Sequence, residues 1–259
     1  METLKFCTTE REGPLFIVTI NRPERMNALH PPANAEFDKV WDDFANDPDL
    51  WVAIITGTGE RAFCAGNDLR YQAEGGEMFR VKSGFAGLTL RYDLTKPIIA
   101  AVNGVAMGGG FETALACDLI IASENAIFAL PEPRVGLAAL AGGVHRLPRQ
   151  IGLKRAMGMM LTGWRVAPRE GKEMGFVNDV VGEGQALEGA KKWAAQILEC
   201  SPMSIRATKQ AAMLGLNEAS VQTASAAEYS AVKAMQKSED YIEGPRAFSE
   251  KRPPQWKGR

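Results

Sequence analysis

The sequence is poor in the residues that most often bind metals or act as general bases. Only two histidines, His30 and His145, occur in 259 residues, and neither belongs to an H-E-x-x-H motif or stands near a G-x-S-x-G elbow. The four cysteines are scattered without C-x-x-C spacing, which disfavours a zinc site and indicates a reducing compartment. We therefore expect neither histidine chemistry nor a metal centre.

The chain is also nearly neutral and has no long apolar run. The 30 basic and 31 acidic residues leave a net charge of −1, so the chain has no general attraction for nucleic acid or an anionic membrane. No apolar run reaches the roughly 18 residues that a membrane-spanning helix needs. Residues 1–12 lack the apolar core of a secretory signal. The sequence thus predicts a cytoplasmic protein without nucleic-acid or membrane partners.

The first half of the chain alternates between apolar runs typical of strands and amphipathic runs typical of helices. We assign strands to residues 14–20, 51–56, 97–102, 118–122 and 126–130, and helices to residues 33–45 and 106–116. Such alternation favours an α/β core with a largely parallel sheet. With 46% hydrophobic residues, the chain can bury the core of one large domain.

From Gly142 onward the pattern becomes helical. We assign helices to residues 144–162, 168–174, 183–199, 202–214 and 217–238. Pro202 is well placed to begin one of them, because proline is favoured in the first turn of a helix. The sequence therefore predicts an all-helical second half.

Three consecutive glycines, at positions 108–110, lead from an apolar run into a helix that carries Glu112. Backbone N–H groups at the start of a helix favour binding of a negatively charged group, because they are unpaired and the positive end of the helix dipole lies there. A second carboxylate, Glu132, follows in a loop between two prolines. Singly each glutamate suits a structural role, but together with the glycines they indicate a site that polarises a carbonyl and moves protons.

Two glycine patterns in the first half of the chain share the spacing of nucleotide-binding motifs but lack other features of those motifs. GTGERA, at residues 57–62, has the G-x-G-x-x-A spacing of a dinucleotide fingerprint, but no helix pattern begins inside it. Residues 104–109 have the spacing of a phosphate loop, yet Gly110 and Phe111 replace its Lys and Ser/Thr. Asp68 is interpreted as the cap of the following helix.

Five segments are distinctive when they are taken together: TINRPERMNAL (residues 19–29), AFCAGNDL (62–69), KPIIAAVNGVAMGGGFETALACDLIIA (96–122), FALPEPRVGL (128–137) and AGGVHRLPRQIG (141–152). This set resembles the crotonase superfamily, specifically the enoyl-CoA hydratase/isomerase family, and residues 238–256 resemble the family's last helix and tail. The resemblance implies an α/β spiral of strand-strand-helix units in residues 1–195. It also implies an all-helical C-terminal trimerisation region in residues 196–259, with assembly as a homotrimer or homohexamer.

The resemblance implies roles for particular residues. The backbone N–H groups of Asn67 and Gly109 fall where the family forms its oxyanion hole around the thioester oxygen of an acyl-CoA. Glu112 and Glu132 match the two glutamates of the hydratases, which add water to the 2,3-double bond of a 2-enoyl-CoA. By resemblance Glu132 is the main proton donor and Glu112 orients the water. No separate cofactor is implied, because coenzyme A is part of the substrate.

Coenzyme A itself is expected to contact a further set of positions that match the family. They are Arg25, Ala62, Ala65, Asn67 and Lys251, the last from the same chain or from a neighbouring subunit. Residues 71–92 are expected to wall the acyl chain. Asn67 and the stretch 138–141 depart from the commonest family residues, and Arg134 could meet a polar acyl group or pair at the surface.

The reaction stays open at this level, because one crotonase frame hosts hydration, isomerisation and several other reactions. A Δ3,Δ2-enoyl-CoA isomerase needs only one acid/base group. A scaffold that binds CoA or a partner without turnover is a further alternative.

Overall fold

The computed structural model describes residues 4–259, and its core is built on two sheets. The larger has the strand order β1-β2-β3-β5-β7-β9 and the smaller the order β4-β6-β8. Apart from the antiparallel pair β1 and β2, all paired strands are parallel. The strands are β1 (Cys7–Glu12), β2 (Leu15–Ile20), β3 (Val52–Gly57), β4 (Ala62–Cys64), β5 (Ile98–Val102), β6 (Val105–Met107), β7 (Leu119–Ser123), β8 (Ile127–Ala129) and β9 (Asp179–Val181).

The strand order shows a repeated unit of two strands followed by a helical segment. Strands β3, β5 and β7 lie side by side in the larger sheet, and each is followed by the next strand of the smaller sheet. The units close with α2 (Leu69–Ala73), α3 (Gly109–Ala116), and the 3-10 turn η3 (Glu132–Val135). This confirms the predicted α/β spiral of strand-strand-helix units.

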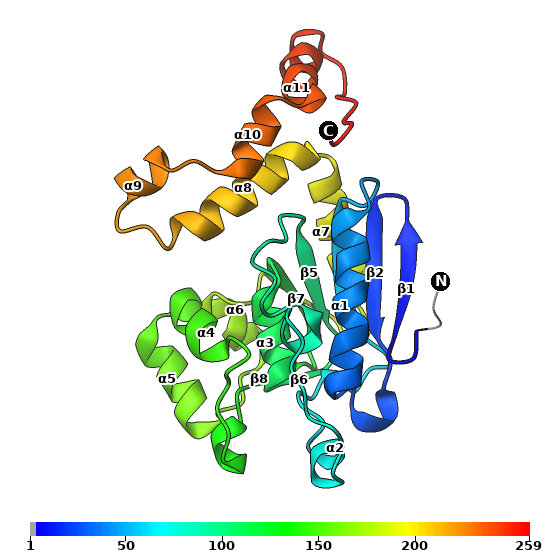
Figure 1. The fold of residues 1–259 in the computed structure, drawn as a ribbon, viewed down its shortest axis with the longest axis vertical. Coiled ribbons are helices and arrows are strands. Elements are labelled where there is room, and N and C mark those ends of the chain that lie inside the picture. The colour runs from blue at the N-terminus through cyan, green and yellow to red at the C-terminus, as the bar shows by residue number, and fades with distance from the viewer. Residues whose placement is uncertain (1–3) are drawn as a thin grey trace.

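Helices cover both faces of the larger sheet (Figure 1). Alternate residues of β2 and β3 point to opposite faces, so Val18 and Ile55 pack with α1 (Pro31–Asn46) in one core while Ile17 and Ile54 pack with α7 (Ala186–Leu198) in another. Because both faces are buried, these strands are mainly apolar, with Thr19 and Thr56 as the polar exceptions.

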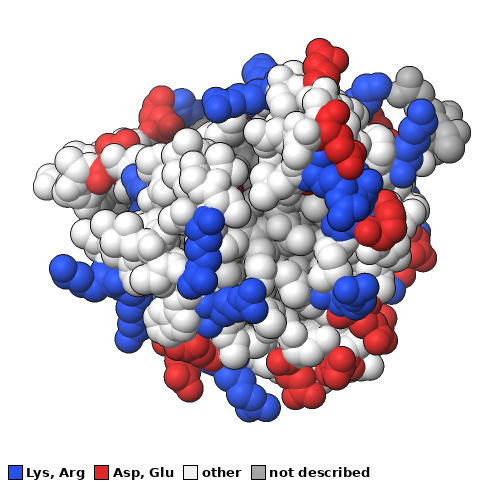
Figure 2. Space-filling model, turned by 90° about the horizontal axis from the view of Figure 1, so that it is seen from below, with Lys and Arg blue, Asp and Glu red and all other residues white. Residues whose placement is uncertain are grey.

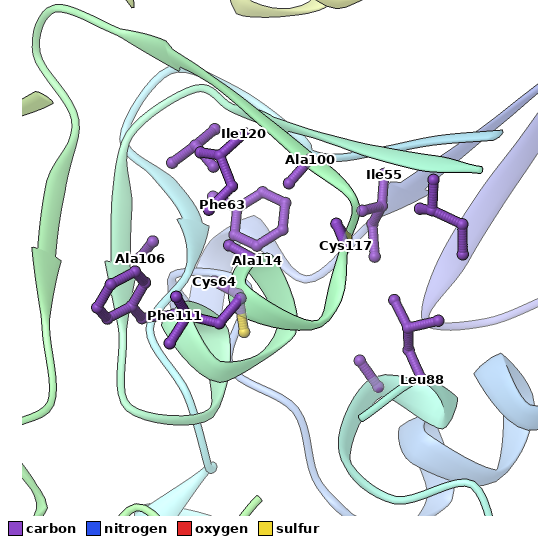
Figure 3. Close-up of a cluster of buried hydrophobic side chains, with 14 of the residues drawn as sticks. Ile55, Phe63, Cys64, Leu88, Ala100, Ala106, Phe111, Ala114, Cys117 and Ile120 are labelled. Atoms are coloured by element: carbon purple, nitrogen blue, oxygen red, sulfur yellow. The ribbon is translucent and has the colours of Figure 1, made fainter. Parts of the chain in front are cut away.

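Helix α3 is enclosed between the two sheets. Residues 109–115 are all buried, and the side chains of Phe63, Phe111 and Ala114 gather around the helix (Figure 3). Phe111 also belongs to an aromatic triangle with Phe128 and Phe176, whose ring centroids lie 5.1–5.2 Å apart. This packing fixes the position of α3, and therefore of Glu112.

Several predicted boundaries were wrong. Residues 106–107 belong to β6, so the helix predicted over residues 106–116 starts at Gly109. The predicted helix 144–162 is broken at Gly152, where φ is 81° and ψ is 152°, into α4 (Gly143–Ile151) and α5 (Leu153–Thr162). The second half is not all-helical either, because β9 extends the larger sheet beside β7. The prediction that Pro202 begins a helix is confirmed.

The C-terminal helices form an arm that projects from the core (Figure 1). They are α8 (Pro202–Gly215), α9 (Val221–Ala226), α10 (Ser230–Gln236) and α11 (Glu239–Ser249). The predicted helix 217–238 is interrupted at Ala227, whose ψ of 151° is extended. The predicted domain boundary at residues 195/196 falls inside α7 and stays a prediction.

The remaining helical segments are short: η1 (Pro23–Arg25), η2 (Phe85–Gly87) and α6 (Pro168–Met174). Among residues 4–259, each helix is too short or too polar to cross a membrane.

Candidate active site

The turn between β6 and α3 is shaped by Gly108. Its φ of 52° and ψ of −127° lie in a region that is unfavourable for residues with a side chain. The turn presents the backbone N–H of Gly109 at the start of α3, which is the positive end of the helix dipole. Within residues 4–259 this N–H donates no hydrogen bond, so it is available to an oxygen of a ligand.

Asn67 lies on a neighbouring loop that is held by a two-sided backbone contact. The N–H of Leu29 donates to the carbonyl of Gly66, and the N–H of Asp68 donates to the carbonyl of Leu29, both at 2.9 Å. Asn67, between these two anchors, has a backbone N–H that donates to no group of the described chain. The side-chain amide of Asn67 is directed instead to Gln72.

The two loops touch through their glycines. A Cβ atom placed on Gly66 would lie 2.7 Å from the carbonyl oxygen of Met107 and 3.2 Å from the nitrogen of Gly109. A Cβ on Gly110 would lie 1.9 Å from the carbonyl oxygen of Cys64. Only glycine permits this close approach of the two loops. As a result, the free N–H of Asn67 lies near the free N–H of Gly109.

Glu112 stands one turn into α3 and is only 3% exposed. Its Oε1 accepts a hydrogen bond of 2.8 Å from the N–H of Gly143, at the start of α4. Burial is the main cause that raises the pKa of Glu112 to about 7, and the charge of Glu132 raises it further against the effect of the Gly143 hydrogen bond. Glu112 can therefore exchange a proton near neutral pH.

Glu132, the first residue of η3, supplies the second carboxyl group of the site. Its Oε1 would lie 3.0 Å from a Cβ on Gly108, so the carboxyl group is beside the glycine turn. Its Oε2 is buried and has no hydrogen-bond partner in the described chain. Burial raises the pKa of Glu132 as well. The structure thus brings the two predicted carboxyl groups together beside the two free N–H groups.

An apolar cavity of about 310 Å³ adjoins these carboxyl groups. Ala139, in its wall, and Glu112 both lie about 3 Å from a Cβ placed on Gly143, and Pro133 in the wall follows Glu132. The ring of Phe85 lies close to Gly109, because a Cβ atom placed on Gly109 would be 2.7 Å from it. The cavity is lined by Leu130, Pro133, Ala138, Ala139, Val144, Pro148, Leu153, Met157, Met160 and Leu161.

The predicted CoA contacts are split between two regions. Arg25 ends η1, and its charge acts on Asp68 beside Asn67. Ala62 and Ala65 lie on and just after β4, with the N–H of Ala65 bonded to the carbonyl of Met26. Lys251 instead follows α11, at the opposite end of the molecule from α2 (Figure 1). A single chain therefore does not bring Lys251 to this site.

Other predicted residues have structural roles. Asp68 caps α2 by accepting from the N–H of Tyr71, as predicted. Arg134 donates to the carbonyl of Thr162 at 2.9 Å, which is a surface pairing. In the GTGERA segment, β3 is followed by β4 and not by a helix.

Three residues around the site, Gly143, Phe85 and Arg22, were not predicted from the sequence. Gly143 holds Glu112 through a backbone N–H, which every residue type except proline has, so the sequence gives no sign of this bond; the close contacts around its Cα are also visible only in the structure. Phe85 lies inside the segment 71–92, where nothing in the sequence distinguishes it from its neighbours. Arg22 is visible only as part of the NRPER motif.

Comparisons with known proteins agree on one family. The model of the family described as enoyl-CoA hydratase/isomerase matches residues 10–259. The chain is 42% identical to a carnitinyl-CoA dehydratase of Citrobacter koseri, covering 100% of this chain and 99% of that protein. It is similar to the crystal structure of an enoyl-CoA hydratase from Mycobacterium tuberculosis, with a TM-score of 0.91, 38% identity, and coverage of 98% and 99%. An enoyl-CoA hydratase from Bacillus anthracis gives a TM-score of 0.90 at 33% identity, covering 98% and 100%.

Proposed function

The chain belongs to the enoyl-CoA hydratase/isomerase family and is an enzyme of the hydro-lyase kind, and from this premise we propose that it hydrates 2-enoyl-CoA thioesters. Water would add in the syn sense across the 2,3-double bond to give a 3-hydroxyacyl-CoA. The observation that carries the proposal is the convergence of the buried carboxyl group of Glu112 and the half-buried carboxyl group of Glu132 beside the free N–H groups of Asn67 and Gly109.

Stabilisation of the enolate is the first task of this site. As the oxygen of water bonds to C3, the electrons of the double bond move through C2 onto the thioester oxygen. The N–H groups of Asn67 and Gly109 would donate to that oxygen, and the start of α3 adds its positive dipole end. Loss of one such donor typically raises the barrier by about 2.7–4 kcal/mol. Because the donors belong to the backbone, the geometry of the loops matters more than the Asn67 side chain.

Proton transfer is the second task, and it requires one carboxylate and one carboxylic acid. The charge of Glu132 raises the pKa of Glu112, and two neighbouring carboxyl groups coupled in this way are disposed to share one proton. By resemblance to the family we assign Glu112 as the base that takes a proton from water; the N–H of Gly143 favours its ionised form and opposes the effect of burial. Glu132 has a buried oxygen without a partner in the described chain, and we assign it as the acid that protonates C2.

The proposal is tested by a panel of 2-enoyl-CoAs and carnitinyl-CoA at neutral pH. Hydration removes the absorbance of the conjugated enoyl thioester, and mass spectrometry of the product locates the hydroxyl group at C3. Loss of absorbance with addition of one water supports the proposal. An unchanged absorbance with every enoyl-CoA, despite measurable CoA binding, would favour a scaffold without turnover.

The pH dependence of kcat/KM follows from the raised pKa of Glu112. The base must be ionised, so kcat/KM should fall about tenfold per pH unit below about pH 7, and loss of the proton from the acid, Glu132, causes a separate fall at higher pH. A glutamate with an ordinary pKa would remain ionised down to a pH about two to three units lower. The measurement is the initial rate of hydration at low substrate concentration across the pH range. A plateau that continues down to the ordinary pKa of glutamate would contradict the assignment of Glu112.

The apolar cavity predicts selection by acyl length. Ala138 lines it and is exposed, so Ala138→Trp should fill the space without strain in the core. We expect kcat/KM for an eight-carbon enoyl-CoA to fall about tenfold or more, in line with the effect of pocket contacts on specificity, while the four-carbon substrate is affected less than about twofold. Equal effects on both substrates would show that the acyl chain does not enter this cavity.

Dehydration is a second candidate direction of the same chemistry. The relatives at 42% identity are named carnitinyl-CoA dehydratases, and removal of water from a 3-hydroxyacyl-CoA uses the same carboxyl groups in reverse. All ten residues that line the cavity are apolar, which favours an uncharged acyl group over the quaternary ammonium group of carnitine. An isomerase activity that needs only one carboxyl group remains the further alternative.

We also propose that CoA lies along Arg25, Ala62, Ala65 and Asn67. The face of the molecule seen from the end where α2 lies has a broad uncharged middle, surrounded by Lys and Arg groups and, along the lower edge and the right side, by Asp and Glu groups (Figure 2). Such a face suits a substrate with an apolar arm and anionic phosphates. Lys251 would have to come from a neighbouring copy in a cytoplasmic homotrimer or homohexamer. Exposed apolar side chains on the arm, Leu216, Val221 and Phe248, support association through residues 196–259.

A further inference from the structure

A buried ion pair lies beneath the loop that carries Asn67. The guanidinium Nη2 of Arg22 is 2.9 Å from Oδ2 of Asp68, and the two side chains are only 10% and 6% exposed. The Nη1 of Arg22 also donates to the carbonyl of Ala28. Arg22 therefore joins the segment that precedes α1 to the residue that directly follows Asn67.

Asp68 is held from three directions. Its N–H donates to the carbonyl of Leu29, one carboxylate oxygen accepts from the N–H of Tyr71 at 3.1 Å, and the other accepts from Arg22. Although burial acts in the opposite sense, the hydrogen bonds from Tyr71 and Arg22 hold the pKa of Asp68 below its usual range. A charged, fully bonded Asp68 fixes the peptide plane on one side of Asn67.

The other side of Asn67 is fixed by the same segment. The carbonyl of Gly66 accepts from the N–H of Leu29, and Leu29 is next to Ala28, whose carbonyl is bonded to Arg22. The guanidinium of Arg22 thus contacts Asp68, on one side of Asn67, directly. It reaches Gly66, on the other side, through Ala28 and the adjoining Leu29. Arg22 touches none of the groups assigned to the reaction.

We infer that Arg22 is a positioning residue, which sets the direction of the Asn67 N–H through its ion pair with Asp68. The inference rests on the proposed function, since it concerns the oxyanion donor of that reaction. Without the guanidinium, the carboxylate of Asp68 would be buried and unpaired, and it would turn toward solvent or take up a proton. Either change tilts the Asn67 peptide while leaving Gly109, Glu112 and Glu132 in place.

Arg22→Met and Arg22→Lys form the informative pair of variants. We expect Arg22→Met to lower kcat by about 10²-fold, which is the effect of small misplacements of catalytic groups, with KM changed less than about threefold. Arg22→Lys restores the charge opposite Asp68 and should recover most of kcat. Arg11→Met is the control, because Arg11 on β1 pairs with Asp47 at 3.1 Å and donates to the carbonyl of Gly13, away from this loop; its kcat should be unchanged.

A measurement without turnover separates the two proposals. The infrared stretching frequency of the thioester carbonyl in bound butyryl-CoA falls when the oxygen accepts strong hydrogen bonds. We expect a shift to lower frequency with the wild type, Arg22→Lys and Arg11→Met, and a smaller shift with Arg22→Met. Absence of the shift in the wild type would overturn the oxyanion site itself. A full shift in Arg22→Met, or equal loss of kcat in Arg22→Lys and Arg22→Met, would overturn the role of Arg22 alone. Should Arg22→Met fail to fold, Asp68→Asn, which keeps the shape of the cap, provides the same comparison.

Discussion

Glu112→Gln is expected to lower kcat for hydration of a 2-enoyl-CoA by about 10²–10⁴-fold, the usual contribution of general acid–base catalysis. Glutamine has nearly the size of glutamate, and its oxygen can still accept the hydrogen bond that Gly143 donates to Oε1. It cannot take a proton from water. The variant therefore removes the chemistry of the side chain and leaves its packing, and KM should change much less than kcat.

Glu36→Gln is a suitable control for this experiment. The Glu36 carboxylate also accepts backbone hydrogen bonds, from Phe6 at 2.8 Å and Cys7 at 3.0 Å, but it holds β1 against α1 and has no part in the site. Its kcat should equal that of the wild type. The two variants are compared by initial rates and by thermal unfolding. Hydration by Glu112→Gln within about threefold of the wild type would exclude Glu112 as the base.

Gly110→Ala is expected to have the second large effect, on both activity and stability. The added Cβ would lie 1.9 Å from the carbonyl oxygen of Cys64 and 2.7 Å from its carbonyl carbon. Backbone atoms cannot rotate away as a side chain would, so α3 and the end of β4 must separate. We expect the free energy of unfolding to fall by about 1–3 kcal/mol or more. Activity should fall at least about 10²-fold, because the two oxyanion donors lie on the two parts that move.

Gly182→Ala shows whether this effect is local. A Cβ on Gly182 would meet only the Cγ of Gln185, at 3.9 Å, so this variant should keep the activity and stability of the wild type. Denaturant unfolding and hydration rates are measured on both variants. Gly110→Ala with unchanged rates would mean that the contact between the two loops does not set the geometry of the donors.

The sequence was informative where a residue type has one strong physical reason to be present. Continuous apolar runs predicted the buried parallel strands, and the glycine triplet with Glu112 predicted the free N–H groups at the start of α3. Asp68 before a helical pattern predicted its cap. In each case the local pattern and the tertiary structure demand the same residue.

Prediction failed where the cause lies in distant parts of the chain. Strands β4 and β6 were not predicted, because they form by pairing between distant segments, β4 with β6 and β6 with β8, and three-residue strands carry no detectable periodicity. The break at Gly152 depends on a positive φ that glycine allows but does not require. The ion pair of Arg22 with Asp68 joins residues 46 positions apart, and a single sequence contains no sign of such a contact.

The stereochemistry of hydration in deuterium oxide shows whether Glu112 and Glu132 act together on one face of the substrate. If Glu112 and Glu132 lie together on one side of the substrate and share one water, oxygen at C3 and deuterium at C2 must arrive on the same face of the double bond. We expect a 3-hydroxyacyl-CoA with a single deuterium at C2, in the syn relationship to the new hydroxyl group by proton magnetic resonance. A product of anti addition, or an equal mixture of the two deuterated forms, would contradict this expectation.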